Sequence, residues 1–228
     1  MCGRFAFFSA AEAVSQLFGV DDAMLSIRPQ YNIAPTDLAA VIRSDESARG
    51  FSMMHWGLLP FWAKDKKMAS RMINARAETV AEKPAYRDAF KTARCIVPAD
   101  GYYEWVATAG GKQPYYISDE RDRPLGMAGL WSHWKSKDGE ERLDTFTVLT
   151  TESTGAIADL HHRSPVMLDD VSAEHWLAGD GDNPPVLREI LSASAATPLR
   201  AWPVTKAVNN ARNDGEALIE PQQDGDGD

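Results

Sequence analysis

The amino-acid sequence predicts an α+β fold: a single domain with a mainly antiparallel, barrel-like β core and peripheral helices. Three observations predict it. Nine short apolar or aromatic segments are separated by Gly, Pro and Asp, which is typical of antiparallel sheets and barrels. Four segments with helical spacing of apolar residues lie before, between and after them. Neither a repeat nor a linker divides the 228 residues, so we expect one domain over residues 1–220.

The first predicted helix follows Ser9-Ala10-Ala11-Glu12, which matches the capping box of a helix start. Val14, Leu17 and Phe18 then recur at helical spacing. Gly19 is typical of a helix end. The sequence therefore predicts a helix that stops at Gly19.

The remaining elements are predicted from helical spacing of apolar residues and from short apolar or aromatic segments typical of strands. Predicted strands cover residues 38–43, 51–56, 95–97, 102–106, 115–118, 125–131, 145–151, 166–168 and 199–204. Helical spacing predicts helices over residues 83–93, where Tyr86 and Phe90 stand four apart, and over 172–177 and 186–192. Residues 221–228 are polar and acidic, and we expect them to form a disordered tail because they cannot pack a core.

The composition excludes several classes of protein. Hydrophobic residues make up 44% and charged residues 25% of the chain, as in ordinary globular domains. No apolar run of 18 residues and no secretory signal is present, so we expect no membrane association and a cytoplasmic location. Cys2 and Cys95 are the only cysteines, too few for a disulfide framework or a four-thiolate zinc site.

The net charge of −9 argues against a protein that coats nucleic acid non-specifically. The charge is nevertheless uneven: residues 60–100 carry nine Lys and Arg against five acidic residues, a net +4, and the remainder carries −13. A local anion-binding surface is compatible with this distribution. So is a solvated helix face with mixed charges over residues 83–94.

Cys2 is the most informative residue of the chain. Removal of Met1 would leave a thiol and a free α-amine on one terminal residue, and a residue as small as Cys at position 2 generally permits that removal. At pH 7 roughly one α-amine in ten is unprotonated, against a few lysines in ten thousand. The amine would therefore form a Schiff base readily. The alternative is a small buried thiol near the start of a strand.

Glu104 lies in the predicted strand Gly101-Tyr102-Tyr103-Glu104-Trp105-Val106. Residues two apart in a strand share a face, so Glu104 would lie with Tyr102 and Val106. A carboxylate on such an apolar face either points to solvent or is desolvated. Desolvation raises its pKa, which suits a general acid or base near neutral pH.

Asn74, Arg76 and Glu78 alternate with alanines. If this segment is extended, an amide, a guanidinium and a carboxylate project together. Arg can bind a phosphate with two hydrogen bonds, and Asn can hold an aldehyde oxygen in place. The alternative is a loop whose polar side chains satisfy local backbone groups.

His161 and His162 stand side by side before a predicted strand. Adjacent side chains of an extended segment diverge, so one imidazole can enter a site while the other faces solvent. The other histidines, His55, His133 and His175, are scattered, and no His-Glu-x-x-His pattern occurs. The sequence therefore predicts no metal site.

Trp56 and Trp62 flank residues 57–61, directly before the basic stretch. Aromatic rings beside Lys and Arg suit single-stranded nucleic acid, because bases stack on rings while cations follow the backbone. Core packing is the alternative use of both indoles.

Six motifs in one order closely resemble the SOS response-associated peptidase family, over nearly the whole chain up to about residue 206. They are Met1-Cys2-Gly3-Arg4-Phe5, Tyr31-Asn32-Ile33-Ala34-Pro35-Thr36, Trp56-Gly57-Leu58-Leu59-Pro60, Ile73-Asn74-Ala75-Arg76-Ala77-Glu78, Pro98-Ala99-Asp100-Gly101-Tyr102-Tyr103-Glu104-Trp105 and His161-His162-Arg163-Ser164-Pro165. Each motif alone is weakly specific, whereas six in this order are highly specific.

The resemblance implies a protein that recognises an abasic site in single-stranded DNA and joins it covalently to Cys2 once Met1 is removed. The amine attacks the ring-opened deoxyribose aldehyde, the thiol captures the imine, and a thiazolidine shields the lesion. The resemblance also implies that Glu104 moves protons, His161 assists ring opening and reversal, and Asn74 positions the sugar oxygen. The implied phosphate contacts are Arg4, Arg76 and Arg163. No cofactor is implied, and we expect a monomer.

Two positions depart from the family's pattern: Ser164, where members often have Met, and Asp37, where Gln is common. Neither carries the implied chemistry. Three other hypotheses stay open. An amidohydrolase with an N-terminal nucleophile also begins Met-Cys-Gly, but the Gly-His-Thr-Arg run and the Asn-Gly oxyanion loop typical of that class do not follow. A peptidase would use Cys2 to cleave its own or other chains. A non-covalent single-strand binder would be strongly salt-sensitive.

Overall fold

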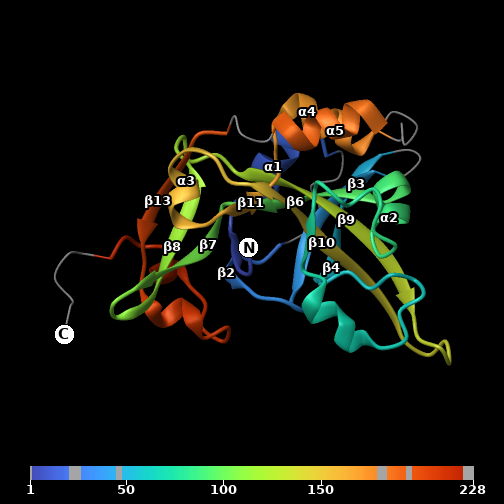
Figure 1. The fold of residues 1–228 in the computed structure, drawn as a ribbon, viewed down its shortest axis with the longest axis horizontal. Helices are drawn as coiled ribbons and strands as arrows, with labels where there is room; N and C mark the ends of the chain where they lie inside the picture. Colours follow the sequence, from blue (N-terminus) through green and yellow to red (C-terminus); the bar gives the residue numbers. More distant parts are fainter. Residues whose placement is uncertain (1, 21–26, 45–47, 179–183, 194–196, 223–228) are drawn as a thin grey trace.

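The computed structural model describes residues 2–20, 27–44, 48–178, 184–193 and 197–222. It contains two β-sheets, one closed into a barrel and one open, with helices on the outside (Figure 1). The predicted α+β domain with a mainly antiparallel, barrel-like core is therefore confirmed.

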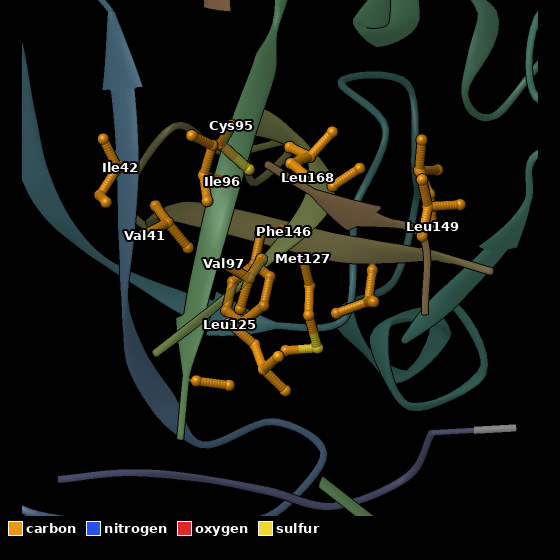
Figure 2. Packing of buried hydrophobic residues seen from close by; sticks show 14 of the residues in the cluster. Val41, Ile42, Cys95, Ile96, Val97, Leu125, Met127, Phe146, Leu149 and Leu168 are labelled. Carbon is orange, nitrogen blue, oxygen red and sulfur yellow. The ribbon is translucent and has the colours of Figure 1, made fainter. Parts of the chain in front are cut away.

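Five strands close the barrel. They are β3 (Leu38–Ser44), β4 (Arg49–Trp56), β6 (Arg94–Ala99), β9 (Leu125–Lys135) and β10 (Arg142–Glu152). The ring runs β10, β4, β3, β6, β9 and back to β10; the β4–β10 pair is parallel and the other four pairs are antiparallel. Val97, Leu125, Met127 and Phe146 lie in its fully buried core (Figure 2). A closed ring leaves none of these five strands with a free edge along the paired segments.

Three short strands extend the barrel sheet. β5 (Asn74–Arg76) lies parallel to β10, β11 (Arg163–Pro165) lies antiparallel to β10, and β12 (Met167–Leu168) pairs with β9. β5 pairs with residues 148–150 and β11 with residues 150–152. The C-terminal half of β10 thus holds β5 close to the segment that enters β11.

The open sheet is antiparallel throughout, in the order β13 (Leu199–Pro203), β8 (Gly111–Asp119), β7 (Gly101–Thr108), β1 (Phe5–Phe7) and β2 (Gln30–Ile33). The chain passes from β6 to β7 through Asp100, whose carboxylate accepts hydrogen bonds from the N–H groups of Phe8 (2.6 Å) and Ser9 (2.8 Å). Gly101 begins β7, and a Cβ there would lie 2.4 Å from the Tyr116 ring. Glycine is therefore required where the two sheets join.

The open sheet has two faces with different partners. Phe5 and Tyr102 belong to the large hydrophobic cluster that includes the barrel strands. Their chain neighbours Ala6 and Tyr103 belong to a smaller cluster on the opposite face. Because side chains alternate along a strand, Glu104 shares the barrel-facing side with Tyr102.

The helices lie outside the two sheets (Figure 1). The α-helices are α1 (Ala11–Phe18), α2 (Arg87–Thr92), α3 (Gly155–Leu160), α4 (Asp170–Leu177) and α5 (Pro184–Ala193), and the 3-10 helices are η1 (Lys66–Arg71), η3 (Lys206–Asn209) and η4 (Glu216–Leu218). No helix among the described residues is both long and apolar enough to cross a membrane.

The predicted first helix is confirmed, including its end at Gly19, which has φ 61°. Its predicted capping box is wrong: Ala10 is the N-cap, and the Ser9 hydroxyl donates to Asp100 instead. The helix predicted over residues 83–93 is shorter because turns occupy residues 83–86. Of the predicted tail, the Gln222 N–H donates to the carbonyl of Pro203 (2.8 Å), and residues 223–228 lie outside the described residues.

Candidate functional site

Four predicted site residues meet between the open sheet and the barrel. Cys2 precedes β1, Asn74 begins β5, Glu104 lies in β7, and His161 follows α3. The Asn74 amide nitrogen donates to the Cys2 carbonyl oxygen (2.6 Å), and His161 Nδ1 lies 3.8 Å from Glu104 Oε1. The negative charge of Glu104 also acts on the Cys2 thiol. Residues from four distant parts of the sequence thus form one cluster.

Cys2 is fully buried, with an exposed fraction of 0%. Its Sγ lies 3.7 Å from the carbonyl oxygen of Arg4. Burial first, and then the charge of Glu104, raise the pKa of the thiol far above its usual value. The sulfur is therefore held as a thiol, and a base must remove its proton before it acts as a nucleophile.

Glu104 is 3% exposed, as expected for a carboxylate on the inner face of β7. Burial raises its pKa because a charged carboxylate loses its hydration there. A raised pKa brings the carboxyl group toward the range in which it both donates and accepts a proton near neutral pH. The sequence-based alternative of a solvent-facing Glu104 is wrong.

His161 lies partly buried beside Glu104. Burial is the main cause that lowers its pKa, so the imidazole is neutral at pH 7. Its Nδ1 lies 3.0 Å from both the backbone N and the backbone O of Arg163. His162 is exposed, yet its ring stacks on that of His161 with centroids 4.4 Å apart. The expected divergence of the two side chains is therefore only partial.

The three arginines expected to contact phosphate lie in different surroundings. Arg4 Nη1 donates to Asn32 Oδ1 (2.7 Å) and to the Val208 carbonyl (2.9 Å). Arg76 is exposed. Arg163 is 9% exposed, and its guanidinium binds Glu78 through Nη1 (2.6 Å) and Nη2 (2.9 Å).

The Arg163 guanidinium is thus bound to protein groups, and its contact with phosphate stays a prediction. Its Nη2 also donates to the Thr150 carbonyl, so the side chain fixes β11 to β10 and to Glu78. The alternation predicted that Glu78 projects together with Asn74. Its carboxylate instead binds Arg163. The hydrogen bond from Arg163 lowers the pKa of Glu78.

The two tryptophans lie in different environments. Trp56 has an exposed fraction of 0%, its Nε1 donates to the Ile73 carbonyl (2.9 Å), and its ring packs on Phe5 and Phe146. It is a core residue, so the expectation that it stacks on DNA is wrong. Trp62 is 47% exposed and remains available to stack.

Sequence reasoning gave no functional role to Tyr102 and Asn32. Tyr102 is fully buried on the same face of β7 as Glu104. Asn32 is 5% exposed and binds both Arg4 and the carbonyls of a C-terminal segment. Both lie inside motifs of the sequence. Strand alternation placed Tyr102 on the face of Glu104, but no local pattern indicated the contacts of Asn32 with residues 210–213.

Among the described residues, no three His, Cys, Asp or Glu side chains gather closely enough to hold a metal ion. The cluster of Cys2, Asn74, Glu104 and His161 instead combines a thiol, an amide, a carboxyl group and a neutral imidazole. Such a set can add a nucleophile to a carbonyl carbon and move the protons that this addition requires.

Comparison with known proteins agrees with the motifs. The sequence matches the family described as SOS response associated peptidase (SRAP) over residues 1–211. It is 36% identical over 223 residues to abasic site processing protein YoqW of Bacillus subtilis, covering 96% of this chain and 99% of that protein. It is 34% identical over 225 residues to abasic site processing protein HMCES of Gallus gallus, covering 85% of this chain and 66% of that protein.

Solved structures share the fold. A phage-related protein from Bordetella bronchiseptica matches with a TM-score of 0.72 at 31% identity, covering 90% of this chain and 95% of that one. A protein from Bacteroides thetaiotaomicron matches with a TM-score of 0.80 at 24% identity, covering 97% of this chain and 100% of that one. With the family match over residues 1–211, these findings lead to one conclusion: the chain belongs to the SOS response associated peptidase family.

Proposed function

We propose that this protein processes abasic sites by joining the ring-opened sugar in single-stranded DNA to the terminal aminothiol of Cys2 once Met1 is removed. The observation that carries the proposal is the clustering of Cys2 with Asn74, Glu104 and His161. The relatives YoqW and HMCES are named as abasic site processing proteins, which supports the choice of substrate.

The proposed reaction has two bond-forming steps. The free α-amine of Cys2 attacks the C1′ aldehyde of the open sugar, and the resulting carbinolamine loses water to give an imine. The sulfur of Cys2 then attacks the imine carbon, and the nitrogen takes up the proton that the thiol gave up. The net change is aldehyde plus aminothiol to thiazolidine plus water.

Glu104 suits both steps because its pKa is raised by burial. As a carboxylic acid it protonates the departing hydroxyl of the carbinolamine, and as a carboxylate it accepts the thiol proton of Cys2. In this proposal neutral His161, which lies 3.8 Å from Glu104, exchanges protons with the sugar during ring opening. Asn74, already bonded to the Cys2 carbonyl, holds the nucleophile in place and presents its amide to the sugar.

The burial of the cluster fits an abasic sugar better than an intact nucleotide. Cys2 and Glu104 are 0% and 3% exposed, so the reacting carbon must enter a confined, water-poor space. A sugar without a base enters such a space at small energetic expense because no stacking has to be broken.

A denaturing gel tests the proposal directly. Protein whose mature N-terminus is Cys2, verified by mass spectrometry, is mixed with a single-stranded oligonucleotide that carries one abasic site. We expect a protein–DNA band that survives denaturation, and none with an oligonucleotide of the same sequence without the lesion. Absence of the band with the abasic oligonucleotide would refute the proposal.

Two cysteine variants provide matched controls. Cys2→Ala keeps the terminal amine, so it should form an imine that borohydride traps, but no adduct that is stable without reduction. Cys95→Ala removes the other buried thiol, in β6, and should form the stable adduct at the wild-type rate.

A second activity, Cys2-dependent removal of Met1, is supported by the family's description as a peptidase. Alanine at position 2 is as small as cysteine and equally permits removal by other enzymes. If Cys2 cleaves its own chain, incubation of purified Met1-bearing protein should release Met1 from the wild type and not from Cys2→Ala, as measured by mass spectrometry. Equal retention of Met1 in both proteins would exclude self-cleavage.

A further inference from the structure

Tyr102 carries a buried hydroxyl group that nothing assigned so far uses. The side chain lies in β7 with an exposed fraction of 0%. Among the described residues, its hydroxyl oxygen has no hydrogen-bond partner. Buried polar groups in folded proteins are nearly always paired, so an unpaired hydroxyl in a well-packed strand calls for a functional explanation.

The position of Tyr102 connects this hydroxyl with the Cys2 cluster. Tyr102 pairs with Phe5 across the β1–β7 ladder and lies two residues before Glu104, on the same face of the strand. It belongs to the same hydrophobic cluster as Cys2. Burial raises the pKa of the phenol, and the charges of Cys2 and Glu104 raise it further. Tyr102 therefore lies on the side of the sheet that carries Glu104, in the cluster that contains Cys2, and its hydroxyl keeps its proton near neutral pH.

Two neighbouring tyrosines show that this placement is particular to Tyr102. The Tyr103 hydroxyl donates to the Tyr31 carbonyl (2.7 Å) on the opposite face of the sheet. The Tyr116 hydroxyl also has no partner among the described residues, but its ring lies in that opposite cluster beside Tyr103 and Trp202. Of these three tyrosines, Tyr102 is the one that shares a cluster with Cys2.

We propose that Tyr102 is a further catalytic residue, which donates a hydrogen bond to the Cys2 sulfur while that sulfur attacks the imine. This inference rests on the proposed function. The thiol is buried and its negatively charged form is strongly disfavoured. A neutral donor aimed at the sulfur stabilises developing negative charge without itself becoming charged.

The Cys2 S–H proton passes to the Glu104 carboxylate, and a sulfur lone pair forms the C–S bond to the imine carbon. The π electrons of the C=N bond move to the nitrogen, which takes the proton from Glu104. Tyr102 gives up no proton: its hydrogen bond to sulfur forms as charge develops and weakens once the C–S bond is complete.

Tyr102→Phe tests the inference, because it removes one oxygen and leaves the ring. A hydrogen bond to a charged group changes a rate by about tenfold or more, so we expect the unreduced, gel-stable adduct to form at least about tenfold more slowly. The borohydride-trapped imine should form at the wild-type rate, because the amine attacks without help from Tyr102. Imine should therefore accumulate before the thiazolidine. Tyr116→Phe, which removes the other unpartnered hydroxyl, should behave like the wild type in both assays.

The outcomes separate this inference from the proposed function. If wild-type protein forms no adduct, the proposed function itself fails. If wild-type protein forms the adduct and Tyr102→Phe forms it equally fast, or loses imine and thiazolidine formation to the same extent, the inference is overturned and the proposed function stands. Should Tyr102→Phe fail to fold, 3,5-difluorotyrosine at position 102 keeps the ring and makes the hydroxyl a stronger donor. It should then accelerate thiol capture, and an unchanged rate would overturn the inference.

Discussion

Glu104 is the residue whose environment is most clearly arranged for proton transfer. Its burial in β7 raises the pKa, and it acts on the charge state of Cys2. We predict that Glu104→Gln slows formation of the stable adduct by about 100-fold, the usual contribution of a positioned acid or base. Non-covalent affinity for the same oligonucleotide should change less than about twofold. Glu78→Gln, a control in a carboxylate that binds Arg163, should keep the adduct rate. Equal losses of affinity and rate in Glu104→Gln would indicate a structural role instead.

The same burial predicts how Glu104 affects stability. A carboxyl group whose folded-state pKa is raised stabilises the fold below its unfolded pKa, and this contribution is lost as the pH rises through the folded pKa. We therefore predict that Glu104→Gln raises the Tm relative to the wild type more at pH 8 than at pH 4. A difference of about 1 kcal/mol shifts Tm by roughly 2–4 °C in a chain of this size. Thermal unfolding at the two pH values measures the effect, and a larger gain at pH 4 would contradict the assigned sign.

The sequence gives Trp56 and Trp62 similar settings, but we predict that one variant loses stability and the other loses affinity for DNA. Trp56 is fully buried between Phe5 and Phe146, so Trp56→Ala should destabilise the fold by about 3–5 kcal/mol. Trp62 is 47% exposed, so Trp62→Ala should leave the Tm nearly unchanged. If a base stacks on it, the variant should bind single-stranded DNA about fivefold or more weakly. Unchanged DNA affinity would remove Trp62 from the binding surface.

Asn32 in β2 forms hydrogen bonds with residues near both ends of the chain. Its side-chain nitrogen donates to the carbonyls of Asn210 (3.1 Å) and Asn213 (2.7 Å), and its oxygen accepts from Arg4 (2.7 Å). Asn32→Ala removes these three hydrogen bonds from a side chain that is 5% exposed, so we predict a loss of about 1–3 kcal/mol in the free energy of unfolding. Because Arg4 lies two residues after Cys2, adduct formation should slow as well.

The control for this element is Asn209→Ala. Asn209 is exposed and accepts one hydrogen bond, from Trp105 Nε1 (2.7 Å). It should change the free energy of unfolding by less than about 1 kcal/mol, as measured by urea denaturation. A similar loss in both variants would mean that Asn32 has no special role in joining β2 to the C-terminal segment.

The sequence predicted elements where a local period was long enough. The alternation around Glu104 indicated a strand with the carboxylate on an apolar face, and the structure confirms both. β1 and β11 have three residues each, too few for a period to be recognised, and they exist because β7 and β10 pair with them.

Side-chain partners far apart in sequence were beyond local reasoning. The Ser9 hydroxyl binds Asp100 instead of capping α1, and Arg163 binds Glu78, 85 positions away. Ser9 suited a helix cap and Arg163 suited a phosphate contact, but each side chain binds a residue that is distant in the sequence. The sequence spacing also gives no distance between Cys2 and Glu104. The four site residues were therefore grouped only through the resemblance of their motifs to the family.

For the whole molecule, charge distribution determines where an anionic strand can approach. The chain carries a net −9, yet residues 60–100 carry +4. Within that stretch, Lys64 and Lys67 are exposed in the segment that carries Phe61 and Trp62, whose side chains are 69% and 47% exposed. The same segment continues through η1 to Asn74 of the site. If the proposed function holds, we expect the bound single strand to follow these cations and rings toward Cys2.

We therefore predict that Lys64→Glu with Lys67→Glu weakens non-covalent binding of single-stranded DNA by about tenfold or more at low salt. It should also reduce the slope of log affinity against log salt by about 1–2, because each lost phosphate contact contributes about 0.7 on a single strand. Fluorescence anisotropy at several salt concentrations measures both quantities. At saturating abasic DNA the adduct rate should equal that of the wild type, since neither lysine belongs to the reacting cluster. Lys112→Glu changes another exposed lysine, on the β7–β8 hairpin, and should leave affinity and slope nearly unchanged. If Lys112→Glu weakens binding as much as the double variant, the DNA follows a different path across the molecule.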